Sequence, residues 1–359
     1  MNIDEILKKS RNGDVLSRRE LILLLDLPPD SPEAYLLMAE ANRVSKDVSG
    51  GKAEVHAQFA VNLAPCGCDC LFCSFAGINN IFSEATELTA VQAVARALRF
   101  EADGANAVFM MSTARYPFER FLEIAGEVKK NLQPATTLIA NVGDQTLKNS
   151  IKLKDAGFAG VYHALRLREG VDTGLSAAGR KRSIFNFKEA GLEVGTCVEP
   201  VGPEHTSEEL AEMIEFTASV NPAYSGAARR ISIPGTEIAG RGMISELRMA
   251  QIVAVTRLGM PRTVPGNCTH EPCTLGAIAG ANLFWAEAGA NPRDIHAKTE
   301  EGRGVTVAGC QALFQESNWD VLCGPSHFYN RGAHGTGQRQ PDRSAADPAA
   351  KHGPVIPVG

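Results

Sequence analysis

The stretch Ala64-Pro65-Cys66-Gly67-Cys68-Asp69-Cys70-Leu71-Phe72-Cys73-Ser74-Phe75 holds four cysteines within eight residues. Three of them, Cys66, Cys70 and Cys73, follow the spacing C-x3-C-x2-C. Each short gap turns the next sulfur back toward the same point, so three thiolates can surround one corner of an inorganic cluster. A cubane [4Fe–4S] cluster normally takes four thiolate ligands. Three protein ligands leave one iron open, which predicts a centre that binds a substrate or cosubstrate.

Two other uses of these cysteines are weaker predictions. A structural zinc site would need a second cysteine pair, usually as C-x2-C. Cys268 and Cys273 come nearest to such a pair, but four residues separate them. A disulfide framework is typical of small secreted chains, whereas this chain has nine cysteines in 359 residues. Cys68 has no place in the triad.

Composition excludes several classes of protein. The length fits one large α/β barrel or two smaller domains, and an apolar content of 44% supports a substantial core. A net charge of −5 gives no basic field for nucleic acid, and no apolar run reaches the length of a membrane span. Acids follow Met1 where a signal peptide would carry bases. With its cysteines free, we expect the protein in the reducing cytoplasm.

Residues 1–50 are predicted to form a helical extension. Ser17-Arg18-Arg19-Glu20 has the form of a capping box at the start of a helix. Pro28 and Pro29 end that helix, and Ser31-Pro32 starts another with proline in its first turn.

Strands and helices alternate after residue 50. The predicted strands are Val55–Leu63, Ala107–Met111, Thr137–Asn141, Gly160–Arg166, Glu193–Val198, Ala228–Ile233, Arg262–Val264 and Asn282–Trp285. Every strand except the last precedes a predicted helix, which favours a parallel (β/α)8 barrel of the TIM type over residues 51–330. Residues 331–359 have almost no large apolar side chain and are predicted to be a disordered tail.

Active sites in such barrels lie at the C-terminal ends of the strands. The cysteine loop follows the first predicted strand, as this rule requires. Asn267, His270 and Glu271 follow the seventh, and we expect Asn267 and His270 to contact the substrate.

The cysteine spacing, with the aromatic Phe72 before Cys73, resembles the signature of the radical S-adenosylmethionine (radical SAM) enzymes. In that family the open iron chelates SAM, and an electron from the cluster yields a 5′-deoxyadenosyl radical that abstracts hydrogen from a substrate. The resemblance implies a [4Fe–4S] cluster on Cys66, Cys70 and Cys73 as the catalytic centre, with SAM as cosubstrate and Phe72 beside it. It also implies a protein electron donor such as ferredoxin or flavodoxin.

The order of features resembles one branch of that superfamily, which contains biotin synthase, the hydrogenase maturase of the same type and methylornithine synthase. This resemblance covers roughly residues 20–290. The matching stretches are His56–Asn62, Asp103–Asn106, Lys154–Gly157, Lys188–Gly195 and Ala279–Asn282.

The branch resemblance implies several SAM contacts. Arg180 lies eight residues before Lys188 and matches the partner of the SAM carboxylate, which a guanidinium binds bidentately; Arg182 is its nearest competitor. Ser112 and Thr113 stand where the branch holds the SAM amino group, although the usual Gly-Gly-Glu pattern is missing. Glu199 lies on the strand that matches the adenine side.

Strand four supplies further candidates. Alternation puts Tyr162, Arg166 and Arg168 on one face and His163 on the other. Because a barrel interior seldom buries arginine without an anionic partner, we expect Arg166 or Arg168, with Glu169, near SAM or the substrate. A salt bridge at the rim is the alternative. His163 is predicted as a substrate contact.

A second iron–sulfur cluster is predicted on Cys268, Cys273, Cys310 and Cys323. Alternatively, Cys268 and His270 contact the substrate while the later cysteines pack. The strand-two and strand-three cysteines of biotin synthase fall near Phe109 and Ile139, which disfavours classical biotin synthesis. Cys197, on strand five, is interpreted as a core residue.

The sequence thus predicts a radical SAM enzyme acting on a small molecule in cofactor or amino-acid biosynthesis. Sulfur insertion or cluster-assisted cofactor assembly would use the extra cysteines. A carbon-skeleton rearrangement or carbon–carbon cleavage on an amino-acid-like substrate would need none. A non-catalytic metal-binding scaffold is a third hypothesis.

Overall fold

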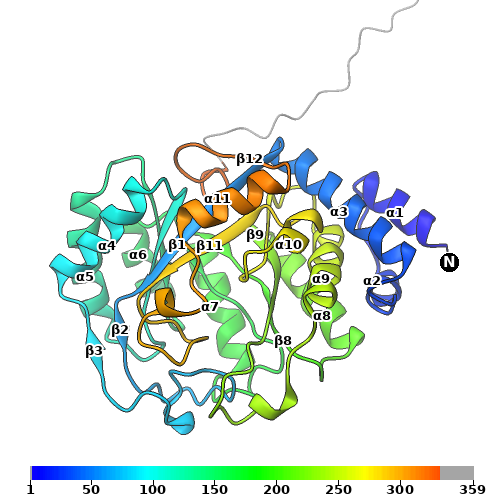
Figure 1. Cartoon of the computed structure of the whole chain (residues 1–359). Helices are drawn as coiled ribbons and strands as arrows, with labels where there is room; N and C mark the ends of the chain where they lie inside the picture. The colour runs from blue at the N-terminus through cyan, green and yellow to red at the C-terminus, as the bar shows by residue number, and fades with distance from the viewer. Residues whose placement is uncertain (1, 332–359) are drawn as a thin grey trace, which may run out of the picture.

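The computed structural model describes residues 2–331, which contain a closed barrel of eight parallel strands (Figure 1). Around the barrel, in chain order, they are β1 (Lys52–Ala60), β4 (Ala107–Met111), β5 (Thr137–Asn141), β6 (Gly160–Tyr162), β7 (Glu193–Gly195), β9 (Tyr224–Arg229), β10 (Gly266–Cys268) and β11 (Leu283–Ala288). The barrel closes because β11 pairs with β1. This confirms the predicted TIM-type (β/α)8 fold.

Helices surround the barrel on its outer face (Figure 1). They are α4 (Ala90–Ala102), α5 (Phe118–Asn131), α6 (Leu147–Asp155), α7 (Ala177–Glu189), α8 (Ser207–Val220), α9 (Glu246–Gly259), α10 (Thr274–Ile278) and α11 (Val307–Glu316). The prediction omitted α11, so it left the last strand without a helix. Thr306 caps α11, and Val307, Cys310 and Phe314 form its buried stripe at helical spacing.

Short elements flank the barrel. β2 (Asn62–Leu63) pairs with β3 (Thr86–Glu87) on either side of the cysteine loop. β8 (Val198–Val201) extends the sheet beside β9, and β12 (Asp320–Val321) pairs with β1. The described residues also contain three short 3-10 helices: Gly77–Asn79, Ala239–Arg241 and Thr299–Glu301.

Several predicted strand boundaries were wrong. Residues 262–264 precede β10, and β9 begins four residues before the predicted strand at Ala228. The predicted fourth strand stops at Tyr162 rather than Arg166. Tyr224-Ser225-Gly226 and Gly266-Asn267-Cys268 lack the β-branched residues typical of strands, so pairing with the neighbouring strands, rather than propensity, places them.

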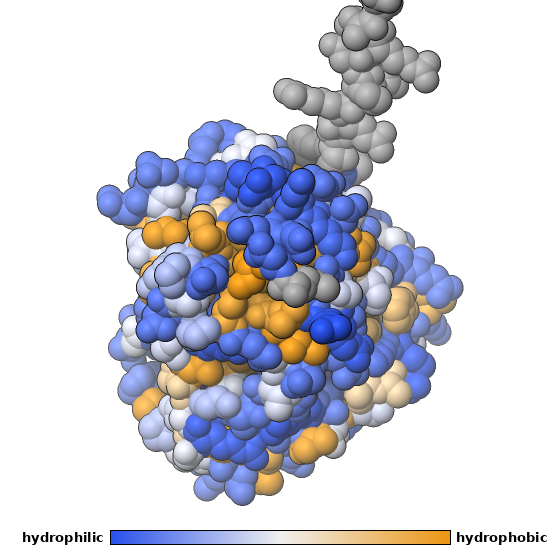
Figure 2. Space-filling model, turned by 90° about the vertical axis from the view of Figure 1, so that its right-hand side faces the viewer, coloured by the Kyte–Doolittle hydropathy of each residue, from blue (hydrophilic) through white to orange (hydrophobic). Residues whose placement is uncertain are grey.

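The N-terminal helices α1 (Ile3–Arg11), α2 (Arg18–Leu25) and α3 (Pro32–Ser49) cover one side of the barrel (Figure 1). Ser17 and Glu20 form the predicted capping box, and Ser31 caps α3. Helices α2 and α3 pack on α8 and α9. Figure 2 looks onto this side, where apolar surface is framed by hydrophilic residues. Within residues 2–331 no helix is both long and apolar enough to cross a membrane.

Residues 326–331 fill the N-terminal end of the barrel. Phe328 and Tyr329 pack with interior aromatic residues, including Tyr224 and Trp285. A Cβ at Gly160 would lie 2.6 Å from the Tyr329 ring, so this close approach requires glycine. The N-terminal end of the barrel is therefore closed, and ligands enter at the C-terminal ends of the strands.

Glu54 of β1 anchors this C-terminal segment. Its fully buried carboxylate accepts hydrogen bonds from Ser326 Oγ (2.6 Å) and from the backbone N–H of His327 (2.7 Å). Arg331, counted in the predicted tail, forms an ion pair with Glu193 of β7. The rest of that predicted tail, residues 332–359, lies outside the described residues, and the division into an extension, a barrel and a tail stays a prediction.

Removing the Glu54 carboxylate is expected to destabilise the barrel strongly. Glu54→Ala removes the acceptor of the buried Ser326 hydroxyl and of the Phe328 N–H, so we expect a loss of about 3–5 kcal/mol in the free energy of unfolding. Urea denaturation followed by circular dichroism measures it. The control is Asp320→Ala. It removes the exposed ion-pair partner of Lys52 between β12 and β1, and it should cost under about 1 kcal/mol. Equal losses in the two variants would contradict the anchoring role.

Candidate active site

A cavity opens at the C-terminal ends of the barrel strands. It has about 1240 Å³ of atom-free space with its open mouth included. Six residues of the cysteine loop line it together: Cys66, Cys68, Cys70, Phe72, Cys73 and Phe75. The structure thus brings the predicted triad and Phe72 to one side of one cavity.

Local hydrogen bonds shape the cysteine loop. Cys66 N–H donates to the Phe75 carbonyl (2.7 Å), which closes the loop at its base. Asn79 Nδ2 donates to the carbonyls of Cys70 (3.2 Å) and Cys73 (2.8 Å). These bonds satisfy backbone groups that no helix or strand pairs, so the bend is defined by the sequence around it.

The loop is also tied to two neighbouring barrel loops. Leu71 N–H donates to the Asp172 carbonyl (2.9 Å) in the loop after β6. Ser74 N–H donates to the Pro292 carbonyl (3.0 Å) in the loop after β11. The thiols therefore keep a fixed position relative to side chains from distant strands.

The spread of the three thiols fits a cluster better than a single ion. Tetrahedral zinc with bonds of about 2.3 Å places its sulfur ligands roughly 3.8 Å apart. Within residues 2–331, the Sγ atoms of Cys66, Cys70 and Cys73 do not all lie within 4.8 Å of one another. Ligands that bind three different irons stand further apart than ligands of one ion, so the donor set suits a cubane.

Cys68 contacts the triad rather than standing apart from it. Its hydrogen bond to Cys66 lowers the pKa of the Cys66 thiol to about 6. Burial raises the pKa of Cys70, and it raises that of Cys73 to about 12. Metal binding therefore has to release protons from the two more buried thiols.

Ser112 and Thr113 follow the end of β4 and line the cavity, as predicted. Thr113 is clamped by Asn62: its N–H donates to Asn62 Oδ1 (3.0 Å), and its Oγ1 accepts from Asn62 Nδ2 (2.9 Å). The Thr113 hydroxyl keeps its proton for another acceptor, and no group within residues 2–331 forms a hydrogen bond with Ser112 Oγ. Both can therefore contact a polar ligand.

Arg166 points into the cavity between two carboxylates. Its Nε lies 3.9 Å from Glu199 Oε1, and its Nη1 lies 4.0 Å from Glu169 Oε2. These distances exceed hydrogen-bond length, so the guanidinium retains donors for an anionic ligand. Glu199 lines the cavity beside it, while Glu169 is buried behind and bonds Thr173 Oγ1 (2.7 Å).

Arg180 lines the same cavity but is held by protein groups. Its Nη1 lies 2.8 Å from His163 Nε2 and 3.3 Å from Asp144 Oδ1. Its Nε lies 3.7 Å from Glu169 Oε2. Burial lowers the pKa of Arg180, and burial together with the charge of Arg180 lowers the pKa of His163 to about 4. His163 is therefore neutral near pH 7.

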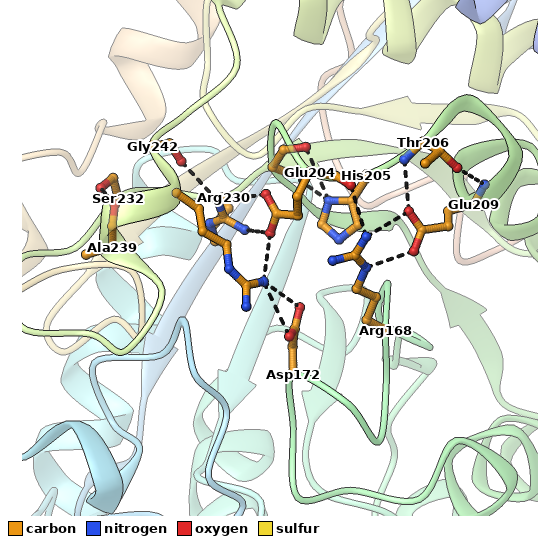
Figure 3. A network of polar contacts seen from close by, with 12 residues as sticks. Arg168, Asp172, Glu204, His205, Thr206, Glu209, Arg230, Ser232, Ala239 and Gly242 are labelled. Atoms are coloured by element: carbon orange, nitrogen blue, oxygen red, sulfur yellow. Dashed lines mark hydrogen bonds and ion pairs between the residues drawn. The ribbon is translucent and has the colours of Figure 1, made fainter.

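Arg168 lies outside the cavity, in the polar network of Figure 3. Its Nε donates to Glu209 Oε1 (2.8 Å), and its Nη2 donates to the Glu204 carbonyl (2.9 Å). Of the two arginines expected near SAM or the substrate, Arg166 lines the cavity and Arg168 does not. Strand alternation failed here because β6 ends at Tyr162 and Arg168 has a φ of +54°.

The predicted residues in and after β10 divide between the cavity and the outside. His270 lines the cavity, whereas Asn267 does not. The Asn267 amide donates outward to the Gly280 carbonyl (3.1 Å), and Asn267 N–H is bonded by Asn282 Oδ1 (2.7 Å). Glu271 forms an ion pair with Arg229. The predicted substrate contact at Asn267 is thus not brought to the site.

The four thiols predicted for a second cluster occupy different parts of the fold. Cys268 lies inside the barrel, and Cys310 lies in the core under α11. Cys273 caps α10, where its Sγ accepts from Gly276 N–H (3.3 Å), and Cys323 is exposed. Cys268 Sγ instead lies 2.7 Å from Cys197 Sγ. The sequence did not indicate this contact because the two cysteines are 71 residues apart in the chain.

Sequence reasoning missed several cavity residues. They are Gln58, Asn141, Glu287, Asn291 and Arg293. Asn141 ends a correctly predicted strand, so the strand-end rule pointed to it. Glu287 was missed because the predicted last strand stopped at Trp285. Burial alone would raise its pKa, but Arg293 and Arg303 hold the pKa of this carboxylate below its usual value.

Comparisons with known proteins agree with this geometry, although no protein-family model matches the chain. Biotin synthase 1 of Corynebacterium diphtheriae is 24% identical over 289 residues, which cover 77% of this chain and 81% of the relative. Biotin synthase of Rhodococcus jostii is 26% identical over 272 residues, which cover 74% of this chain and 80% of the relative.

Solved structures share the fold. Methylornithine synthase (PylB) superposes with a TM-score of 0.74 at 18% identity, over 91% of this chain and 99% of that one. The FeFe-hydrogenase maturase HydG of Carboxydothermus hydrogenoformans gives 0.74 at 17% identity, over 92% and 81%. The sequence similarity to biotin synthases supports assignment to the biotin synthase-like branch of the radical SAM enzymes, and the structural likeness shows the shared barrel fold.

The neutral state of His163 predicts a pH dependence of stability. The imidazole titrates at about 6.5 when unfolded and about 4 when buried, so the unfolded chain gains a proton first as pH falls. We expect the free energy of unfolding to drop by about 3 kcal/mol between these pH values on account of this group. His163→Gln should remove that part of the slope, whereas His296→Gln, at an exposed site, should not. Parallel curves for wild type and His163→Gln would contradict this.

Proposed function

We propose that this chain is a radical SAM enzyme of the biotin synthase-like branch, acting on a small anionic molecule inside the barrel. The carrying observation is a three-cysteine loop that opens onto a deep cavity lined by arginines. Cys66, Cys70 and Cys73 would hold a [4Fe–4S] cluster, which supplies the electron that cleaves SAM.

The polar residues nearest the loop would bind SAM. Ser112 and Thr113 offer oxygens to its amino group. Arg166 suits its carboxylate better than Arg180, because the Arg166 guanidinium makes only long contacts while Arg180 is occupied by His163 and Asp144. In this arrangement Glu169, which accepts a hydrogen bond from the Arg166 N–H (3.0 Å), would position Arg166 from behind, and Glu199 would face the adenosine part of the ligand.

The substrate would occupy the part of the cavity away from the cysteine loop. Arg293 reaches it from the loop after β11, and its Nη1 is buried without a hydrogen-bond partner. The Tyr162 hydroxyl is likewise buried and unpartnered on the cavity wall. A substrate with a carboxylate or phosphate group would satisfy both. The filled N-terminal end of the barrel would keep water from reaching this region from that side.

Two reaction classes remain within this proposal. Sulfur insertion or cluster assembly in cofactor biosynthesis would require further sulfur-bearing sites. The dispersal of Cys268, Cys273, Cys310 and Cys323 favours the other class, a carbon-skeleton rearrangement or cleavage of an amino-acid-like substrate. The electron would come from a ferredoxin or flavodoxin. We place the protein in the cytoplasm, where its nine free cysteines stay reduced.

The central experiment is anaerobic reconstitution, followed by analysis of iron, sulfide and SAM cleavage under a strong reductant. We expect about four irons per chain and formation of 5′-deoxyadenosine; about eight irons would favour sulfur insertion. Cys70→Ala should abolish cleavage and leave a folded barrel, whereas Cys323→Ala, at an exposed thiol, should retain it. A colourless protein holding only zinc, or no cleavage at all, would refute the proposal and favour a metal-binding scaffold.

Binding of SAM tests the assignment of Arg166. Arg166→Gln removes a charge-assisted hydrogen bond, so we expect the dissociation constant to rise about 10- to 100-fold. Arg168→Gln makes the same charge change outside the cavity and should alter affinity less than about twofold. Calorimetry on the cluster-loaded protein gives both values. If Arg180→Gln weakens binding while Arg166→Gln does not, the carboxylate contact belongs to Arg180.

A further inference from the structure

A second group of metal-ligating side chains lies inside the barrel, apart from the cysteine loop. Cys197 Sγ is 2.7 Å from Cys268 Sγ and 3.6 Å from His270 Nε2. The three ligand atoms all lie within 4.8 Å of one another. Both cysteines are buried and free of disulfides.

The backbone brings these residues together across β9. Cys197 follows β7, and Cys268 ends β10, with β9 lying between the two strands. Gly226 of β9 pairs with Cys268, and a Cβ there would lie 2.1 Å from the Cys268 carbonyl oxygen. Because glycine permits this close approach, the two sulfurs can meet over β9.

We propose that Cys197, Cys268 and His270 form a binding site for a single thiolate-preferring divalent metal ion, with Zn²⁺ the first candidate. Tetrahedral zinc places neighbouring sulfur and nitrogen ligands roughly 3.3–3.8 Å apart. The separation of 3.6 Å between Cys197 and His270 already fits. The two sulfurs would have to move apart by about 1 Å on binding, a change that rotation of their side chains can supply.

The surroundings favour one ion over a cluster. The His270 ring lies 5.5 Å from Tyr162 and 5.2 Å from Trp285, measured between ring centroids. These neighbours supply no thiolate, and the three ligand atoms all lie within 4.8 Å of one another, a closeness that suits the ligands of one ion rather than of three different irons. His270 lines the cavity while Cys197 and Cys268 do not, which leaves the fourth coordination position directed toward the substrate space.

Three ligands and an open position are typical of catalytic rather than structural metal sites. The Tyr162 hydroxyl, buried without a partner, lines the same cavity. An ion here would take an oxygen, nitrogen or sulfur atom of a substrate and hold it in the cavity that the cysteine loop also lines. The inference goes beyond the proposed function, because it does not depend on SAM chemistry.

A comparable cluster elsewhere does not meet the same conditions. Asp172, Glu204 and His205 also lie close together, in the network of Figure 3. There the carboxylates already pair with arginines: Glu204 contacts Arg230, and Asp172 lies 3.5 Å from Arg241. Their charge is neutralised without a metal, whereas Cys197, Cys268 and His270 have no such counter-charge in contact.

X-ray absorption at the zinc edge tests the site in the cluster-loaded protein, since the iron of the first cluster does not contribute there. After anaerobic incubation with Zn²⁺ and removal of excess metal, we expect about one zinc per chain. Its nearest neighbours should include two sulfurs at about 2.3 Å and a nitrogen at about 2.0–2.1 Å. Cys197→Ser, Cys268→Ser and His270→Gln should each reduce zinc content at least tenfold, while Cys310→Ser, at another buried thiol, should keep it.

Two controls keep the test decisive if a variant is damaged. The far-ultraviolet circular dichroism and about four irons per chain must persist in each variant that loses zinc. Loss of about one iron by Cys268→Ser but not by Cys310→Ser would support the same site with iron as its ion. Zinc retained by both Cys197→Ser and Cys268→Ser, a Cys197–Cys268 disulfide in the anaerobic protein, or no metal beyond the first cluster would overturn the proposal.

Discussion

The cysteine loop is an irregular segment that must hold three thiols still. Its backbone polar groups cannot pair within a helix or a strand, so other parts of the chain have to satisfy them. Asn79, in the 3-10 helix that follows the loop, donates to the carbonyls of Cys70 and Cys73, and the carbonyls of Asp172 and Pro292, in two other barrel loops, accept from the cysteine loop. Any ligand bound by the thiols is thereby placed relative to side chains from strands far apart in sequence.

The charged residues of the cavity follow from the same constraint. A buried guanidinium requires an anionic partner, and a buried carboxylate requires a cation. Arg180 has Asp144 and Glu169, and Glu287 has Arg293 and Arg303. Arg166 is the exception, because its carboxylate partners stand at 3.9–4.0 Å. A cation that lines a cavity and whose carboxylate partners stand beyond hydrogen-bond length keeps donors free, and this supports the proposed binding of an anionic ligand.

Much of the fold followed from local pattern. The strands Ala107–Met111 and Thr137–Asn141 were predicted to the residue. Prediction failed where strands consist of small or polar residues, as at Tyr224–Arg229 and Gly266–Cys268, because there the hydrogen bonds of the closed barrel decide the conformation. Because of these two errors, the neighbours of Arg229 and Cys268 were not predicted.

By itself, the sequence determined the cysteine spacing, the alternation of strands and helices, and therefore a barrel with a three-thiol loop at its catalytic end. These features are local, since each depends on residues close together in the chain. Tertiary structure alone decided that Arg166 and not Arg168 faces the cavity, that Asn267 points away from it, and that Cys197 meets Cys268. The reason is geometric: which side chains share an interior depends on where each strand ends and how the strands register, and long-range pairing fixes both.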